Sequence, residues 1–428
     1  MSVREGYKQT EIGVIPVEWN CQSMEDIFII TAGKSKSKFV VENGKYTLID
    51  MGAIDRNGQI VNKKFLDIED DFLAAKDLVM PKDDIGGGQI IGKVVYIPQN
   101  NKYILGDHVF KLTLKDDFCA RYFYYLINSS YVNRTFRKKA TGTAQIGLGK
   151  KSVAEQPLAV PPLPEQQKIA AILTSVDNKI EVIDEQIAKT ETLKKGLMQE
   201  LLSEGIGHTA FKESKIGRIP KEWEVVRLGD CIVNKGQYGI NAPATDFNEN
   251  LPTYLRITDI DENGNFITSN RKCVAHQDSD DFILKDGDIV FARTGNTTGK
   301  SYLYNPKDGK LVFAGFLIKF TLQQDKLYPY YLKLITQTQR YWNWVKVTST
   351  RTGQPGINSE EYSRLVLPLP PIQEQKQIAI ILSTTDNKLD TLREKKSRYE
   401  KLKKGLMQKL LTGKVRVKPY NEDAKEIK

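Results

Sequence analysis

The sequence predicts an α/β (α+β) protein built as a tandem duplication, in which two globular modules are separated by two long antiparallel coiled-coil helices. First, residues 161–170 return as residues 370–379, and residues 193–199 return as residues 402–408, both 209 positions further along the chain. Second, Ile-Gly-x-Ile-Pro-x-x-Trp stands near the start of each copy. Third, a repeat of roughly 200 residues is much longer than the about 20 to 50 residues of solenoid units, so each copy can bury a core of its own.

The stretches before the repeated helical parts, residues 20–158 and 224–367, have a mixed α/β pattern and match each other only in patches. Short runs rich in β-branched and aromatic residues predict strands at 94–97, 109–114 and 317–322. Amphipathic aromatic runs predict helices at 122–127 and 330–335, whose rings we expect in the core rather than stacked on bases. The closely matching parts therefore represent framework, and the divergent parts are the candidates for recognition.

Each framework segment predicts one long helix with a narrow apolar seam, because apolar residues recur at alternating spacings of four and three. The seam residues of the two copies are Ile169, Leu173, Val176, Ile180, Ile183, Ile378, Leu382, Leu389 and Leu392. Pro-Pro-x-x-Glu-Gln suits a helix start, since proline is tolerated in the first turn and a carboxylate complements the positive end of the helix. A seam this narrow needs one partner helix, which the other copy supplies; an ordinary bundle within a single core is the alternative.

Two glycines, Gly196 and Gly405, lie in the middle of the predicted helices at equivalent positions. Glycine costs about 1 kcal/mol against alanine in a helix interior. We therefore expect close backbone approach where the helices cross.

These patterns divide the chain into six contiguous segments. They are a first module (1–158), a first long helix (159–204), a linker (205–215), a second module (216–367), a second long helix (368–413) and a charged, flexible tail (414–428).

Composition favours a polyanionic partner such as nucleic acid, because the net charge is +10 and the pI is about 9.1. A merely basic surface is the alternative. Four widely spaced cysteines without a Cys-x-x-Cys pair indicate reduced thiols and no zinc site. No apolar run reaches about 18 residues and no signal peptide opens the chain, so we expect a cytoplasmic protein without a membrane partner.

The loop from Phe291 to Lys300 follows an apolar run and is rich in small hydrogen-bonding residues between two cations. A phosphate-binding P-loop would need a glycine where Thr294 stands, so that alternative is disfavoured. Arg293 and Asn296 can instead form bidentate hydrogen bonds to guanine and adenine edges.

A basic segment rich in threonine and glycine precedes each long helix, at residues 137–145 and 346–354. Amides, hydroxyls and cations together suit phosphate contacts, although a solvated loop is the alternative. The segments around Lys34–Lys38 and at Lys235–Gly239 are weaker candidates for the same role. The chain has three histidines and no metal-ligand or hydrolase motif, so the sequence indicates neither a catalytic centre nor a metal site.

In this tandem order, the module starts, the Pro-Pro-x-x-Glu-Gln helix starts and the Leu-Lys-Lys-Gly-Leu-Met-Gln helix ends resemble the specificity (S) subunits of type I restriction-modification systems. The resemblance covers essentially the whole chain. It implies a non-catalytic subunit whose modules are target recognition domains, each reading one half of an asymmetric bipartite DNA site. It also implies that the long helices set the spacer between the half-sites and dock methyltransferase (M) subunits.

Carried onto this chain, the resemblance implies DNA contacts from polar and basic loop residues of both modules. They are Lys82, Gln89, Lys93, Lys138, Thr143 and Gln145 in the first module, and Arg293, Thr294, Asn296, Lys300, Arg351, Thr352 and Gln354 in the second. The loops differ between the modules, since Pro81-Lys82-Asp83-Asp84 stands in the first where Ala292-Arg293-Thr294-Gly295 stands in the second. We therefore expect two different half-sites.

The partners implied are double-stranded DNA, two M subunits and restriction (R) subunits. S-adenosylmethionine, ATP and Mg²⁺ are expected in those subunits, and no cofactor is expected in this chain. A coiled-coil adaptor with protein-binding modules and a self-sufficient restriction enzyme are the competing hypotheses.

Overall fold

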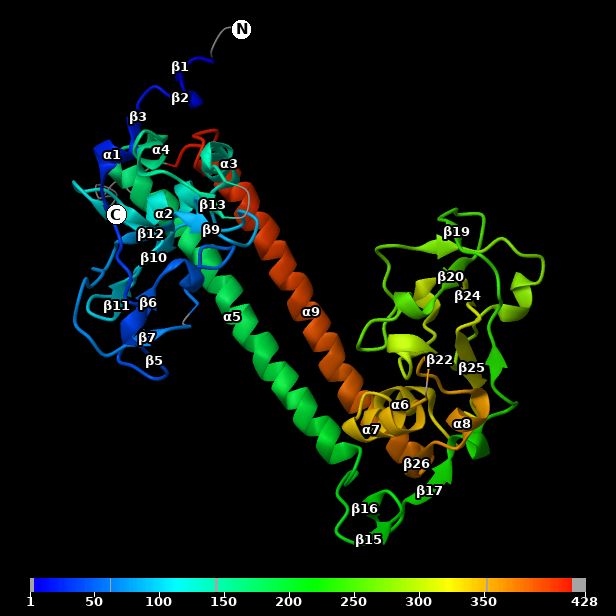
Figure 1. Ribbon diagram of the computed structural model, residues 1–428. Helices are drawn as coiled ribbons and strands as arrows, with labels where there is room; N and C mark the ends of the chain where they lie inside the picture. Colours follow the sequence, from blue (N-terminus) through cyan, green and yellow to red (C-terminus); the bar gives the residue numbers. More distant parts are fainter. Residues whose placement is uncertain (1–3, 62, 143–144, 352, 418–428) are drawn as a thin grey trace, which may run out of the picture. The chain divides into compact units, whose positions relative to one another are not determined.

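A computed structural model describes residues 4–61, 63–142, 145–351 and 353–417, which form two compact units (Figure 1). Unit 1 contains the described residues up to Asp184 and from Glu394 onward, and unit 2 runs from Glu185 to Arg393. The division differs from the contiguous segments expected above, because each long helix contributes one half to each unit.

Unit 1 contains two four-stranded sheets. The first has the order β10–β8–β12–β4 and is antiparallel; the second has the order β11–β6–β7–β5, with β11 and β6 parallel. The strands are β4 (Phe28–Ala32), β8 (Leu78–Pro81), β10 (Val95–Tyr96), β12 (Val109–Leu114), β5 (Val40–Val41), β6 (Tyr46–Ile49), β7 (Phe65–Leu66) and β11 (Tyr103–Leu105). Two-stranded pairs join β1 (Tyr7–Thr10) to β2 (Gly13–Pro16), β3 (Asn20–Ser23) to β14 (Pro157–Val160) and β9 (Asp83–Asp84) to β13 (Ile146–Gly147). The helices are α1 (Met24–Ile27), α2 (Ala120–Asn128), α3 (Ser130–Lys139) and α4 (Lys150–Ala154).

Unit 2 repeats both sheets, including the one parallel pairing. The orders are β18–β25–β22–β23 and β19–β21–β20–β24, with β20 and β24 parallel. The strands are β18 (Gln237–Tyr238), β22 (Asp288–Ala292), β23 (Ser301–Leu303), β25 (Leu317–Thr321), β19 (Thr245–Asp246), β20 (Thr253–Leu255), β21 (Lys272–Cys273) and β24 (Leu311–Phe313). Pairs join β15 (Phe211–Ser214) to β16 (Gly217–Pro220) and β17 (Glu224–Arg227) to β26 (Val366–Leu369), and the helices are α6 (Pro329–Ile335), α7 (Gln339–Thr348) and α8 (Ser359–Ser363). The duplication therefore extends through the modules, where the two sequences diverge.

The predicted strands and helices of the modules are confirmed, and so is the place of their aromatic residues. Tyr122 and Tyr331 are fully buried and donate from their hydroxyls to the carbonyl oxygens of Ala159 and Pro368 at 2.9 and 3.3 Å. Burial raises the pKa of both tyrosines well above its usual value, so both hydroxyls stay neutral donors. These rings belong to the core and are not free for base stacking.

The two long helices are α5 (Leu163–Leu201) and α9 (Ile372–Leu410), each of 39 residues. The predicted seam is confirmed: its residues are buried except Ile180, which is half-buried. The first seam residues of each helix, such as Ile169 and Ile378, also belong to the cores of the globular modules. The seam therefore joins each helix both to its partner and to its own module.

The helices run antiparallel within each unit and lie side by side in Figure 1, where α5 is green and α9 orange to red. In unit 1, ion pairs join α5 to α9 at Asp177–Lys403 and Asp184–Lys396, both 2.6 Å long. The residue numbers rise on one helix as they fall on the other, which confirms the predicted direction.

The expectation of close backbone approach at Gly196 and Gly405 is wrong. A Cβ built at either glycine would meet nothing within 4 Å among the described residues. The apolar seam holds the helices together, and both glycines face open space.

Near the start of each long helix a carboxylate, buried in Glu165 and half-buried in Glu374, accepts a hydrogen bond from the tryptophan near the start of the module. Trp19 Nε1 donates to Glu165 at 2.9 Å in unit 1, and Trp223 Nε1 donates to Glu374 at 3.0 Å in unit 2. Both tryptophans are fully buried. The Ile-Pro-x-x-Trp and Pro-Pro-x-x-Glu-Gln motifs are thus the two halves of one contact, repeated in each copy.

The segment that follows each long helix contacts the carboxylate near the start of the other long helix. Arg416 donates to Glu165 from Nε at 2.8 Å, and His208 Nε2 lies 2.9 Å from Glu374. The prediction of a flexible tail from residue 414 is therefore wrong for its described part, up to Val417; residues 418–428 lie outside the described residues.

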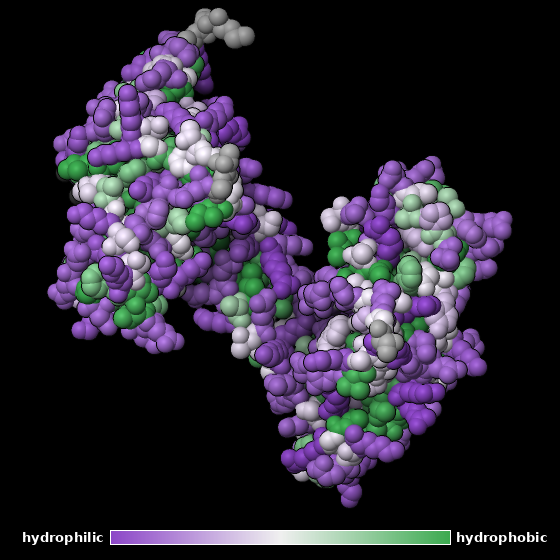
Figure 2. All heavy atoms as spheres, viewed as in Figure 1, coloured by the Kyte–Doolittle hydropathy of each residue, from purple (hydrophilic) through white to green (hydrophobic). Residues whose placement is uncertain are grey.

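Within the described residues, no helix is both long enough and apolar enough to cross a membrane. On the face shown in Figure 2, hydrophilic residues cover most of the surface and hydrophobic ones are scattered between them.

Candidate nucleic-acid interface

In the second module, buried tyrosines hold the loop between β22 and β23, residues 293–300. Tyr362 donates from its hydroxyl to the carbonyl of Ala292 at 2.8 Å, and Tyr341 donates to that of Gly299 at 2.6 Å. Gly299 has φ +94°, and a Cβ there would lie 2.7 Å from Val345 of α7. Only glycine allows this backbone conformation and this approach of the helix, so the loop is anchored at both ends.

The end of the second predicted segment (346–354) and the residues that directly follow it, up to Ile357, lie beside this loop: a Cβ built at Gly295 would lie 3.0 Å from Nε2 of Gln354. Thr294 and Gly356 form an antiparallel bridge, and the amide of Gly295 donates to the carbonyl of Pro355 at 2.9 Å. Arg293 accepts from the amide of Ile357 at 2.9 Å. The structure thus brings together two candidate segments that are more than 50 positions apart in the sequence.

The side chains in these loops differ in their freedom to bind a ligand. Lys300 pairs with Glu262 at 2.7 Å and donates to the carbonyl of Ile260, and Arg351 pairs with Glu361. Asn296 and Gln354 are exposed, Thr294 is half-buried, and Thr352 lies outside the described residues. Two of the predicted cations are therefore already neutralised by carboxylates of the same module.

Arg293 is different, because its guanidinium has no ion-pair partner and donates no hydrogen bond among the described residues. It lies over the ring of Tyr238, with its central carbon 4.9 Å from the ring centroid. An aromatic face attracts the cation and leaves its N–H groups available.

The first module brings its two predicted segments together in the same way. β9, which directly follows Lys82, pairs with β13, and the amide of Leu148 donates to the carbonyl of Lys82 at 2.7 Å. Between β9 and β10 the glycine-rich loop is held by Asp84, which accepts from the amide of Ile90 at 2.9 Å. Arg137 donates to the carbonyl of Gln89 at 3.0 Å.

The predicted contact residues of the first module also have different surroundings. Lys138 and Gln145 are exposed, Lys82 and Gln89 are half-buried, and Thr143 lies outside the described residues. Lys93 donates from Nζ to the carbonyl of Asn128 at the end of α2, at 3.3 Å, and burial lowers its pKa. Lys93 therefore has a structural partner, and its contact with DNA stays a prediction.

Carboxylates distinguish the first loop from the second. Asp83, beside Lys82, lies 2.6 Å from Nδ1 of His108. The second module has Arg293 and Thr294 at the positions that correspond to Lys82 and Asp83. The two loops therefore differ in charge, and different half-sites for the two modules stay a prediction.

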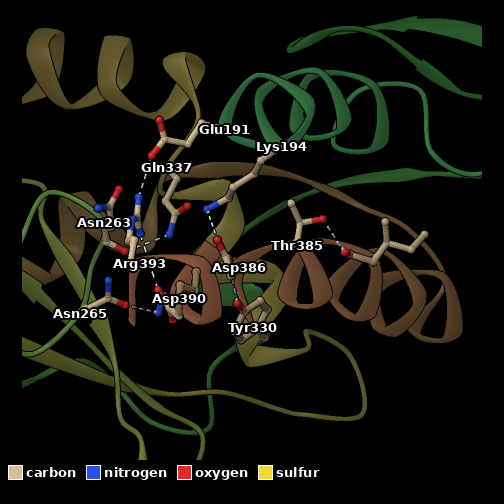
Figure 3. A network of polar contacts seen from close by, with 12 residues as sticks. Glu191, Lys194, Asn263, Asn265, Tyr330, Gln337, Thr385, Asp386, Asp390 and Arg393 are labelled. Atoms are coloured by element: carbon tan, nitrogen blue, oxygen red, sulfur yellow. Dashed lines mark hydrogen bonds and ion pairs between the residues drawn. The ribbon is translucent and has the colours of Figure 1, made fainter. Parts of the chain in front are cut away.

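A polar network holds the second module against the helix pair (Figure 3). Asp386 of α9 forms an ion pair with Lys194 of α5 at 2.6 Å and accepts from the hydroxyl of Tyr330 of α6 at 3.3 Å. Arg393 of α9 pairs with Glu191 of α5 at 2.8 Å. Unit 1 has the matching group, in which Asp177 contacts Lys403 and the hydroxyl of Tyr125 at 2.7 Å.

Sequence reasoning missed the residues that position these loops and close the helix ends. The tyrosine anchors depend on contacts more than 40 positions apart, and no local pattern reveals them. Arg416 and His208 could have been found, because each stands three positions after a glycine, Gly413 and Gly205, that follows the end of a long helix, where glycine is common.

In the part of the chain that the structure describes, no group of three or more histidine, cysteine, aspartate or glutamate side chains could hold a metal ion. The P-loop alternative gains no support either, since Lys300 is engaged by Glu262 and a backbone carbonyl.

The chain matches the model of the family described as type I restriction modification DNA specificity domain twice, over residues 16–192 and 220–401. It is 30% identical to the putative type I restriction enzyme MjaX specificity subunit of Methanocaldococcus jannaschii and 29% identical to the MjaVIII specificity subunit of the same organism, in each case over 97% of both chains. The crystal structure of the type I restriction-modification S subunit from M. genitalium has the same fold. Its TM-score is 0.63 at 14% identity, and the match covers 96% of this chain and 98% of that one.

Proposed function

Because this chain belongs to the type I restriction modification DNA specificity family, we propose that each of its modules binds one half of an asymmetric bipartite DNA site. In this proposal the chain is the recognition subunit rather than an enzyme, and its relatives are named specificity subunits. One observation carries the assignment of the site: in both modules the folded chain brings the two predicted polar segments side by side.

In this proposal the two kinds of loop residue have different tasks. Exposed cations such as Lys138, which has no ion-pair partner among the described residues, contact phosphates and set the register. Side chains that present several hydrogen-bonding groups, such as Arg293, Asn296 and Gln354, read base edges in the major groove.

The long helices set the distance between the half-sites and dock the methyltransferase subunits. Their seam residues, including Ile169 and Ile378, are buried within this chain and are therefore not available to a partner. Exposed apolar side chains on the same helices support a docking role instead. They are Val182 and Leu193 on α5 and Ile380 and Leu402 on α9, each about half exposed.

In this proposal the partner subunits carry out the chemical reactions. Two M subunits would methylate adenine in each half-site with S-adenosylmethionine after flipping the base out of the stack, and R subunits would use ATP and Mg²⁺. The present chain binds none of these cofactors in this proposal.

The test is a long-read methylome of the host with the gene intact and deleted, scored for N6-methyladenine. We expect one asymmetric bipartite motif to disappear on deletion and to return on complementation. An unchanged methylome, with the M subunits verified as expressed, would refute the proposal and favour the coiled-coil adaptor.

Purified chain in complex with its M subunits provides a second readout. Its affinity for a duplex with the motif should fall steeply as salt rises, because released counterions drive phosphate binding. Binding without sequence preference would contradict the assignment of the loops.

A further inference from the structure

We propose that Arg293, held in place by Tyr238, reads a guanine in the half-site of the second module. The inference rests on the proposed function, since it takes the two adjoining loops of that module as the DNA-facing surface. It assigns one base type to one side chain and gives Tyr238 the task of positioning it.

The backbone of Arg293 is fixed on both sides. Its amide donates to the carbonyl of Phe316 at 3.0 Å, and its carbonyl accepts from the amide of Ile357 at 2.9 Å. The residue directly follows the fully buried strand β22. The side chain therefore projects from a rigid point rather than from a mobile loop tip.

The guanidinium is held without being neutralised. It lies 4.9 Å from the ring centroid of Tyr238, whereas Lys300 and Arg351 each have a carboxylate partner. Tyr238 is itself fixed, because it stands in β18 and its hydroxyl accepts from the amide of Ser359 at 3.2 Å. An arginine ordered by a ring loses less freedom on binding and keeps its fork of donors for a base.

Guanine is the base that fits such a fork, because it presents O6 and N7 as neighbouring acceptors in the major groove. An exposed aromatic side chain, Phe316, lies beside this position and is 56% exposed. Its apolar face suits the base pair next to the guanine, where a thymine methyl would make an apolar contact.

The experiment uses the full chain co-purified with its methyltransferase partner and a pool of duplexes with randomised half-sites. Four variants are compared with the wild type: Arg293→Lys, Tyr238→Leu, Tyr238→Phe and, as a matched control, Tyr304→Leu. Tyr304 belongs to the same module but follows β23 at the opposite end of β22, where its amide donates to Asp288.

We expect one guanine of the second half-site to lose its selection by about fivefold to a hundredfold in Arg293→Lys and Tyr238→Leu. The first half-site should stay unchanged in both variants. Tyr238→Phe retains the ring and should keep the preference, and Tyr304→Leu should behave as the wild type. Replacing that guanine by 7-deazaguanine, which lacks N7, should weaken the wild type more than Arg293→Lys, because a lysine ammonium lacks the planar fork that pairs with N7 and O6 together.

Two results would overturn the assignment. In the first, Arg293→Lys and Tyr238→Leu weaken binding equally for all sequences, as phosphate contacts or misfolding would. In the second, the 7-deazaguanine substitution affects the wild type and Arg293→Lys equally. A wild-type complex that selects no bipartite motif would refute the proposed function itself, which separates the two failures.

Discussion

Replacing Glu374 by alanine should destabilise unit 2 by about 2 to 6 kcal/mol. The carboxylate accepts from the indole of Trp223 at 3.0 Å, from the amide of Ile206 at 2.9 Å and lies 2.9 Å from Nε2 of His208. Leaving the N–H of the fully buried Trp223 without a partner costs about 1 to 3 kcal/mol, and the two other contacts add a comparable amount.

The assay is urea unfolding combined with hydrogen exchange, which assigns the loss to a region of the chain. Protection should fall at the start of α9 and in the turn after α5, while unit 1 keeps its own protection. Glu360→Gln in the same unit is the control, because Glu360 forms an exposed pair with Arg364 at 3.8 Å and such pairs contribute about 0.5 kcal/mol or less. A loss below about 1 kcal/mol for Glu374→Ala, or an equal loss of protection in both units, would refute the reasoning.

Three further outcomes follow from the same structure. Gly405→Ala should stabilise unit 1 by up to about 1 kcal/mol in urea unfolding, since its Cβ would meet open space. Gly413→Ala should destabilise unit 1, because φ there is +67° and the Cβ would lie 2.5 Å from Pro16. If Gly405→Ala were the less stable of the two variants, the reasoning about both glycines would be refuted. The Lys36 ammonium lowers the pKa of Asp71, so the stability from this pair is present above about pH 4 and is lost as the pH falls further. The urea midpoints of the wild type and Asp71→Asn should therefore converge toward pH 3. A difference between the midpoints that does not change with pH would show that the ion pair is not its cause. Inserting four residues into the middle of each long helix adds about 6 Å of rise and should lengthen the spacer of the methylated motif by about one or two base pairs, whereas an unchanged spacer would refute the role of the helices in setting it.

Much of the framework could be predicted because its signals are local. The repeated motifs, the spacing of the apolar residues and the strand-forming runs each lie within a few residues of one another, and hydrophobic burial follows such patterns directly. The Pro-Pro-x-x-Glu-Gln motif likewise indicated the start of each helix. The glycines were misread, since a position in the sequence does not say whether a neighbouring backbone is close.

The candidate interface was predicted as two separate segments in each module, and its assembly could not be. The adjacency of Thr294 and Gly356 depends on tertiary contacts between segments that are far apart in the chain. The order of the tail up to Val417 could not be predicted for the same reason, because Glu165, the partner of Arg416, stands 251 positions earlier in the chain.

The sequence by itself therefore determined the duplication, the helix pair and its direction, and the family to which the chain belongs. Only the tertiary structure decided which candidate cations are free. Lys300 and Arg351 resemble Arg293 in sequence, but Glu262 and Glu361 neutralise the first two, while Tyr238 holds the third without a counter-charge. Electrostatic availability depends on the distances between side chains, and folding sets those distances through contacts that no local pattern records.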